Sequence, residues 1–111
     1  SAPAGRLTAQ VTESLRAATA DPTRRAEALE SYRQLLQLHP GVRLPLSAYR
    51  AAADIAHIAS QWDLEVLTAE RAARHHASDP ATPPIVGRAA RVCRERLGNP
   101  RRADQLEALL R

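Results

Sequence analysis

The chain has 111 residues and a mass of 12.1 kDa, and its formal net charge of +4 gives an isoelectric point near 10.5. Its 16 basic residues are all arginines and only 4 residues are glycines, which excludes Schiff-base lysine chemistry, a phosphate-loop lysine and a glycine-rich phosphate cradle. Aromatic residues make up only 3% of the chain, so the core of this single domain has to be built from alanine, leucine, isoleucine and valine, which favours closely packed helices.

Prolines divide the chain into segments of helical length, and the first two segments predict helices over about 5–20 and 23–39. The sequence Asp21-Pro22-Thr23 separates them, and Asp21 or Thr23 is expected to cap the second helix. The apolar positions recur at the helical period; they are Leu7, Val11, Leu15 and Ala18 in the first segment and Ala28, Leu29, Tyr32, Leu35, Leu36 and Leu38 in the second.

The third segment, about 45–61, predicts a helix that is apolar around most of its circumference. Its strongly polar residues form a single stripe, made of Arg50, Asp54, His57 and Gln61. A helix of this kind packs against neighbours on more than one side, so we expect it at the centre of the fold.

Three further helices are predicted over about 63–77, 83–97 and 100–110, and because no segment alternates with a period of two, the predicted fold class is all-α. Glu65, Arg71 and Arg74 are expected to point outward. Gly98 is expected to end the fifth helix in a left-handed conformation. The expected inward positions are Leu64, Val66, Leu67, Ala69, Ala72 and Ala73 in the fourth helix, Ile85, Val86, Ala89, Val92, Cys93 and Leu97 in the fifth, and Ala103, Leu106, Leu109 and Leu110 in the last.

An internal repeat orders these helices. Pro40 and Pro80 each end a helix, and the sequence over 24–30 is echoed over 101–107. Three helix–turn–helix units emerge within one domain, and they cover about 5–40, 45–80 and 83–111. A single hairpin cannot bury its apolar face alone, so we expect the units to pack on one another. The leucines of the last helix either pack on the fifth helix or meet a partner or a second copy of the chain.

The spacing of several residues resembles that of the tetratricopeptide repeat (TPR) family, over about 9–111 of the chain. The positions that carry the resemblance are Ala28, Tyr32, Leu35 and Pro40 in the first unit and Gly98 and Ala103 in the third. The resemblance implies a right-handed, TPR-like α-solenoid of about six antiparallel helices in three hairpins, acting as a non-catalytic protein-interaction module. A plain helical bundle is the alternative fold.

The resemblance also implies that the first helix of each hairpin lines a concave face that binds a peptide, either from a partner protein or from a second copy of the chain. A small apolar floor with arginine and glutamate at its rims suits an extended or helical peptide. Ile55 and Ile58 could instead be buried by the neighbouring hairpin. The implied binding residues are Gln10, Glu13 and Ala17 in the first hairpin, Ala51, Ile55 and Ile58 in the second, and Arg88, Val92 and Glu95 in the third.

Arginines crowd the third hairpin and suggest an alternative function, an accessory domain that binds nucleic acid or anionic lipid. Against this, acidic residues are interleaved with the arginines, as on solvated helix faces with pairs such as Arg91–Glu95. The aromatic platforms that bind single-stranded nucleic acid are also missing. The alternative anionic site consists of Arg88, Arg91, Arg94, Arg101 and Arg102.

No constellation of residues predicts catalysis, so we expect neither an enzyme nor a cofactor. Cys93 falls on an apolar helix face and is expected to be an inert core residue. Asp54 and His57 share one helix face, but no second pair with ligand spacing follows, so we expect no metal site.

The single cysteine fits a reducing compartment, and no apolar run approaches the ~20 residues of a membrane span. We therefore expect a cytoplasmic location. Because the sequence starts Ser-Ala-Pro-Ala-Gly without methionine, we expect a piece of a larger parent protein, which is soluble or membrane-anchored.

Overall fold

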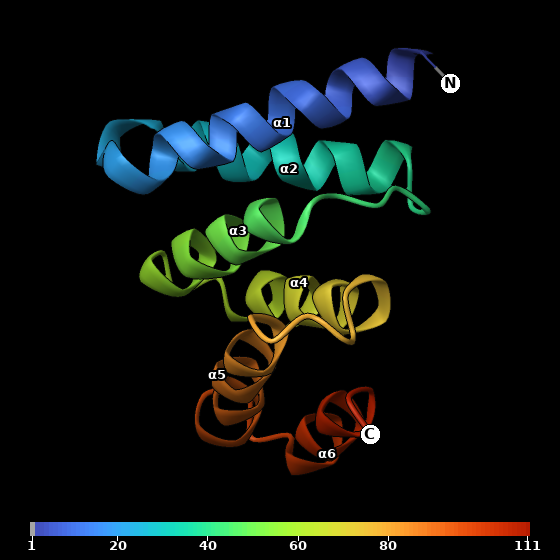
Figure 1. Cartoon of the computed structure of the whole chain (residues 1–111). Helices are drawn as coiled ribbons and strands as arrows, with labels where there is room; N and C mark the ends of the chain where they lie inside the picture. The colour runs from blue at the N-terminus through green and yellow to red at the C-terminus, as the bar shows by residue number, and fades with distance from the viewer. Residues whose placement is uncertain (1) are drawn as a thin grey trace.

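Six α-helices and one 3₁₀ turn form the structure, a computed structural model that describes residues 2–111, with side chains from residue 4 onward (Figure 1). The elements are α1 (Ala2–Ala20), η1 (Pro22–Arg24), α2 (Arg25–Leu38), α3 (Leu46–Ile58), α4 (Trp62–His75), α5 (Thr82–Glu95) and α6 (Pro100–Ala108). Residues 2–111 contain no strand, so the all-α prediction is confirmed over this range. The second predicted helix is divided into η1 and α2, and α1 begins earlier than predicted.

The helices pack in sequential pairs, α1 with α2, α3 with α4, and α5 with α6. The three pairs follow one another through the molecule, which measures 37 × 29 × 24 Å (Figure 1). The middle pair holds the others together, because α3 packs against α1 and α2 while α4 packs against α5 and α6. Because α4 packs against α5 as extensively as the helices within each pair pack on one another, the six helices form one continuous packed body.

Side-chain caps and prolines set the starts of two elements. Asp21 accepts hydrogen bonds from the backbone N–H of Thr23 at 3.0 Å and from its hydroxyl at 2.6 Å, and Pro22 follows it directly. Asn99 likewise accepts from the N–H of Arg102 at 3.0 Å, just before α6 begins. A proline in a first helical turn costs little, since the N–H it lacks has no helical partner there.

The core is built from small side chains, as the composition predicts. Seven of the thirteen residues of α3 are buried, most of them alanines, and this confirms its predicted central position. Short alanine side chains let helices approach closely, and two tyrosines fill the remaining volume. Tyr32 and Tyr49 are both fully buried, and the Tyr32 hydroxyl lies 2.8 Å from the Thr68 hydroxyl. The leucines of α6 pack on this core, Leu106 completely and Leu109 and Leu110 in part.

Three positions were predicted on the wrong side of their helices. Glu65 was expected to point outward but has no exposed surface. Leu38 and Leu67 were expected inward but are 68% and 37% exposed. Ile58, expected on the binding face or else buried by the neighbouring hairpin, is 60% exposed. Leu38 and Leu67 lie beside the buried arc of their helices, and Ile58 lies in the last turn of α3, where the neighbouring helices no longer cover it. Among the described residues, no helix combines the length and apolar character needed to cross a membrane.

The connection between α2 and α3 is fixed to the end of α4 by polar contacts. The Tyr49 hydroxyl accepts from the N–H of Leu44 at 3.2 Å and lies 2.8 Å from Nδ1 of His75. Since that hydroxyl already accepts a hydrogen bond, its own proton is available to a neutral His75 ring. Burial, together with the charges of Arg71 and Arg43, lowers the pKa of His75 below its ordinary value of 6.5.

We expect His75 to make the fold sensitive to mild acid. As the pH falls below 6.5, the unfolded chain becomes protonated at this position before the folded chain does. The free energy of unfolding therefore decreases until the pH has fallen below the folded-state pKa of His75. Above pH 6.5, His75 makes its full contribution to stability. His75→Asn keeps an acceptor near Nδ1 and should flatten this part of the pH dependence in urea unfolding. A proton NMR titration that places the pKa of His75 above 6.5 would contradict the prediction.

Gly98 is expected to be the glycine whose replacement costs most. It has φ +58°, the left-handed conformation predicted for the end of the fifth helix, and an added side chain there is strained although space is open. Gly98→Ala should lower the free energy of unfolding by about 1 kcal/mol. Gly87→Ala, within helix α5 and equally open, is the matched control and should raise it by about 0.5–1 kcal/mol, measured by urea denaturation. Equal changes in the free energy of unfolding for Gly98→Ala and Gly87→Ala would contradict the left-handed conformation at Gly98.

Candidate functional site

A groove crosses one face of the molecule over the first helix of each pair. It consists of two adjoining hollows of about 530 and 230 Å³, which share Arg50, Asp54 and Ala81. We call this continuous surface the central groove. Its remaining lining residues are Arg16, Thr19, Leu46, Ser47, Ala51 and Asp79 around the larger hollow and Pro84, Ile85 and Arg88 around the smaller one.

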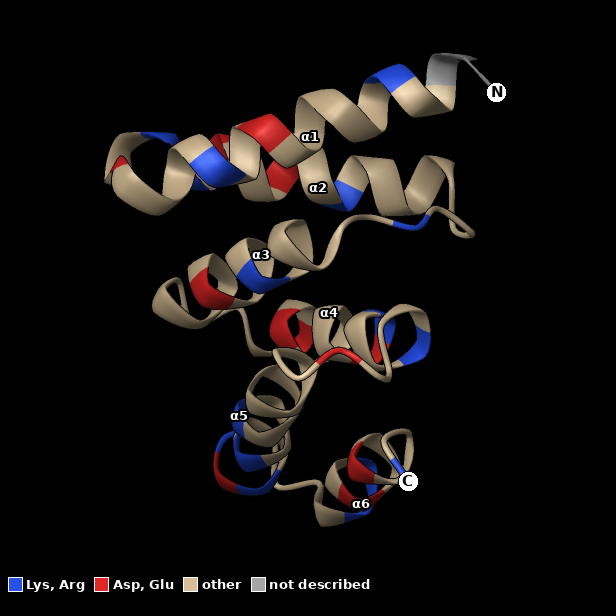
Figure 2. Ribbon diagram, viewed as in Figure 1, with Lys and Arg blue, Asp and Glu red and all other residues tan. Residues whose placement is uncertain are grey.

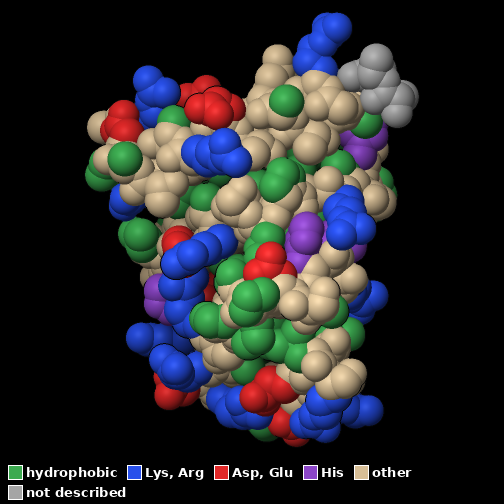
Figure 3. Space-filling model, viewed as in Figure 1, with side chains coloured by type: hydrophobic (Ala, Val, Ile, Leu, Met, Phe, Trp, Pro, Cys, Tyr) green, Lys and Arg blue, Asp and Glu red, His purple; other side chains and the backbone are tan. Residues whose placement is uncertain are grey.

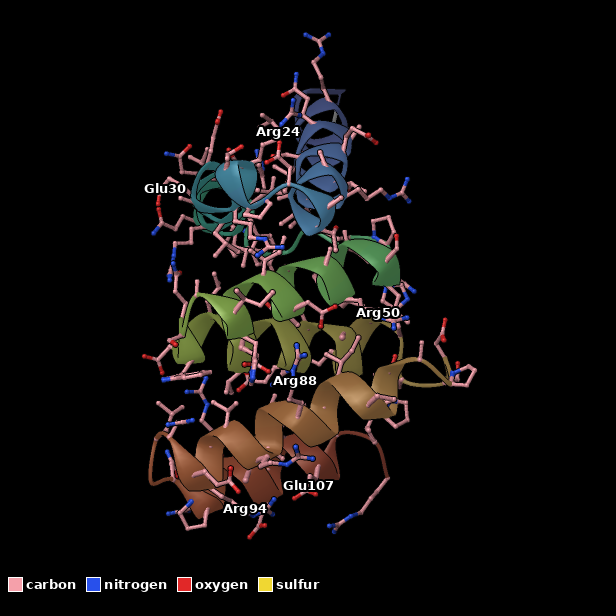
Figure 4. The ribbon with its side chains drawn as sticks, turned by 90° about the vertical axis from the view of Figure 1, so that its left-hand side faces the viewer. Arg24, Glu30, Arg50, Arg88, Arg94 and Glu107 are labelled. Carbon is pink, nitrogen blue, oxygen red and sulfur yellow. The ribbon has the colours of Figure 1, made fainter. Side chains whose placement is uncertain are left out.

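Beneath the central groove, one arginine joins three helices. Arg88 of α5 donates from Nε to the Glu65 carboxylate of α4 and from its terminal nitrogen to the Asp54 carboxylate of α3, both at 2.8 Å. His57 of α3 donates from Nδ1 to the second oxygen of Glu65, also at 2.8 Å. Figure 4 shows Arg88 between the ribbons of α3 and α5. We call Asp54, His57, Glu65 and Arg88 the buried charge network, after the buried Glu65 carboxylate at its centre; the other three side chains are 31–40% exposed.

The network explains why Glu65 points inward. Its carboxylate is completely buried, and a buried charge is tolerated only when it is paired and hydrogen-bonded. Both of its oxygens have a donor, one from His57 and one from Arg88. The sequence did contain a signal: Glu65 has helical spacing with Ala69 and Ala72, both of which are buried. The position therefore lies in the middle of the buried face of α4.

Two other arginines of the groove keep their charges free for a ligand. Arg16 of α1 donates to the Ser47 hydroxyl at 3.3 Å, and neither Arg16 nor Arg50 forms an ion pair within residues 4–111. Both residues are exposed. Figure 3 shows basic side chains along the flank of the molecule at the level of α3 and α5. The acidic residue Asp79 already accepts from the N–H of Ala81 at 2.9 Å.

The predicted peptide-binding residues do not lie together on one surface of the structure. Ala51 and Arg88 line the central groove. Ile55 and Val92 are core residues, with 1% and 4% of their surface exposed, so Ile55 is buried by its neighbours. Ile58 and Glu95 are exposed outside the groove. A separate hollow beside α1 is lined by Gln10, Glu13 and Ala17 together with Ser14, Arg24 and Glu27.

Sequence reasoning did not assign several groove residues to a binding site. Arg50 and Asp54 were recognised as members of a polar stripe on α3, and this stripe does face the groove. Arg16, Ser47 and Asp79 were missed, because they come from the end of α1, the start of α3 and a loop. Only the packing of these separate segments places them together.

The predicted anionic site is largely neutralised within the fold. Arg88 belongs to the buried charge network, and Arg94 pairs with Asp104 and Glu107 of α6. Arg102 pairs with Glu70, at 3.3 Å. Figure 2 shows acidic and basic positions side by side on α5 and α6, and Figure 4 shows Arg94 beside Glu107. The two remaining members of the site, Arg91 and Arg101, are exposed.

The histidines and the cysteine have structural surroundings. His76 lies 2.8 Å from the carbonyl oxygen of Leu44, and His57 and His75 have the partners described above. The described residues contain no group of three or more side chains able to hold a metal ion. Cys93 is free and completely buried, and burial raises the pKa of its thiol, which disfavours the reactive thiolate.

Comparison with known protein families, with curated proteins and with solved structures found no match for this chain. The similarity to TPR units therefore rests on the spacing of its own residues. What the central groove can bind has to be inferred from its shape and charge.

The buried charge network should dominate the stability of the fold. Arg88→Met leaves the Glu65 carboxylate buried without its main counter-charge and should lower the free energy of unfolding by about 3 kcal/mol. Arg91→Met, on the same helix but exposed, is the control and should change it by less than about 0.5 kcal/mol. Adding Glu65→Leu to Arg88→Met should recover part of the loss, because both buried charges are then gone. Urea denaturation measures all three variants, and equal losses in Arg88→Met and Arg91→Met would contradict this role.

Proposed function

We propose that this chain is a non-catalytic, TPR-like protein-interaction module whose central groove holds an acidic segment of a partner protein. The observation that carries the proposal is a groove over three helices in which two exposed guanidinium groups have no carboxylate partner. The proposal includes the finer fold assignment, in which the three hairpins form a short right-handed solenoid.

The shape of the central groove suits a peptide chain. Its lining contains small or apolar side chains, among them Ala51 of α3, Ala81 just before α5, and Ile85 of α5. A floor of this kind accepts a short apolar side chain without selecting a bulky one. The groove also continues from α1 to α5, which suits an extended or helical segment better than a compact small molecule.

The charges of the groove favour an acidic partner. Arg16 and Arg50 lie on its edges, and a carboxylate between them would accept charge-assisted hydrogen bonds. Asp54 does not cancel this preference, because its own charge is already paired with Arg88. The partner we propose therefore carries Asp or Glu beside a small apolar residue.

The buried charge network supports binding by holding the groove in shape. Arg88 and Asp54 belong both to the network and to the groove lining. Side chains that are already fixed lose less conformational entropy when a ligand binds. The network thereby contributes to affinity even where it does not touch the ligand.

Two further observations support a binding role. The buried, unactivated thiol of Cys93 favours a structural residue over a nucleophile. The internal pairing of Arg88, Arg94 and Arg102 leaves less free charge for nucleic acid or lipid than the sequence suggested.

The proposal is tested by selecting binders from a random peptide library displayed on phage. We expect enrichment of peptides with Asp or Glu next to a small apolar residue. Arg50→Glu should weaken the selected peptides by about tenfold or more in fluorescence titrations. Arg101→Glu makes the same change of charge outside the groove and should leave their affinity unchanged. Ile55→Glu is unsuitable, because the side chain is buried and the change would test folding.

Other outcomes would overturn the proposal. Peptides that bind wild type and Arg50→Glu equally would place the site elsewhere. Binding of a single-stranded RNA or of acidic vesicles that weakens steeply with salt, and that is lost in Arg91→Glu but kept in Arg50→Glu, would favour the alternative anionic function.

A further inference from the structure

The outer side of the first hairpin carries a groove between α1 and α2 whose lining mixes polar and apolar side chains. It has a volume of about 310 Å³. Its polar lining residues are Gln10, Ser14, Glu27, Ser31 and Gln34, and its apolar ones are Leu7, Leu38 and the core residues Val11 and Leu35. Leu38 is 68% exposed and is the most exposed large apolar side chain among those described. We call this surface the end groove, since α1 and α2 form one end of the stack of helices (Figure 1).

The opposite end of the stack is closed in a different way. Arg94 of α5 binds Asp104 and Glu107 of α6, so charged side chains cover the outside of the last pair. The leucines of α6 point back into the core. A repeat stack needs a polar outer face at each end to stay soluble, and α1 and α2 also expose polar side chains, among them Gln10, Glu27 and Gln34. What distinguishes the end groove is the exposed Leu38 among these polar side chains.

The charges on α1 indicate what this partner is. Arg6 and Glu13 are both exposed, lie two helical turns apart, and form no ion pair within residues 4–111. Gln10 lies between them on the same stripe and also lines the end groove. One helix thus carries a positive charge, a neutral polar centre and a negative charge in that order.

Such a stripe is complementary to itself when two copies run in opposite directions. If the helices cross at Gln10, Arg6 of each copy faces Glu13 of the other, giving two equivalent ion pairs. Seven residues of helix span about 10 Å, and α1 with its 19 residues is long enough to contain both pairs. A contact that pairs residue i with residue j and j with i is the mark of a two-fold symmetric interface.

We infer that two copies of this chain form an antiparallel dimer through their end grooves, with the two α1 helices crossing at Gln10. Leu38 of each copy then packs into the end groove of the other, beside the two charge pairs. This interface does not include the central groove. The dimer would therefore present two peptide-binding grooves. Its test is independent of the test of the proposed function.

A charge-exchange experiment tests the dimer. We expect the wild-type protein to sediment as a dimer in analytical ultracentrifugation, and Arg6→Glu and Glu13→Arg each to weaken the dimer by about tenfold or more, because each change places like charges opposite one another. An equimolar mixture of the two single variants should form a mixed dimer, since every pair is then complementary. The combined variant Arg6→Glu/Glu13→Arg should dimerise again by itself.

Controls separate this interface from general effects of charge. Arg101→Glu and Glu95→Arg make the same charge changes at exposed positions of the third hairpin and should remain dimeric. Leu38→Ser should weaken the dimer while the helix content in circular dichroism stays unchanged, because the side chain is mostly exposed in the single chain. The inference is overturned if the wild-type protein is a monomer at about 100 μM, or if the mixture of single variants does not associate.

Discussion

The buried carboxylate of Glu65 constrains how the second and third hairpins can meet, because a charge without exposed surface must be balanced inside the protein. His57 from α3 and Arg88 from α5 both donate to it, so three helices share one charge. Alanine-rich helix surfaces could pack in several neighbouring registers, but directional hydrogen bonds between charged groups favour a single one. The shape of the central groove depends on that register, since Asp54 and Arg88 belong to both.

Two sets of arginines in this chain differ in what surrounds them. Arg88, Arg94 and Arg102 form ion pairs between helices and act as cross-links. Arg6, Arg16 and Arg50 are exposed and form no ion pair within residues 4–111. Arg16 and Arg50 line the central groove, and Arg6 lies on the stripe of α1 that includes Gln10 of the end groove. A net charge of +4 therefore says little by itself about ligands, because what counts is which guanidinium groups remain unpaired after folding.

The many alanines and the scarcity of aromatic residues have a structural consequence beyond composition. Close helix packing leaves little internal volume, and the two buried tyrosines both use their hydroxyl groups to join distant segments. Tyr49 in particular ties the start of α3 to the end of α4 through His75. The core is thus specified by a few polar contacts as well as by apolar packing. For this reason we expect substitutions of single polar residues to change the free energy of unfolding.

The sequence by itself determined the six helices, their approximate bounds, the caps at Asp21 and Gly98 and most of the buried positions. These features depend on neighbours three or four residues away, so helical periodicity reveals them. Only the tertiary structure decided that Glu65 is buried, that Leu38 is exposed and that Arg50 remains unpaired beside Asp54. The reason is distance along the chain: Arg88 meets Glu65 across 23 positions and Asp54 across 34, and no local pattern shows which opposite charge a folded chain will bring to an arginine.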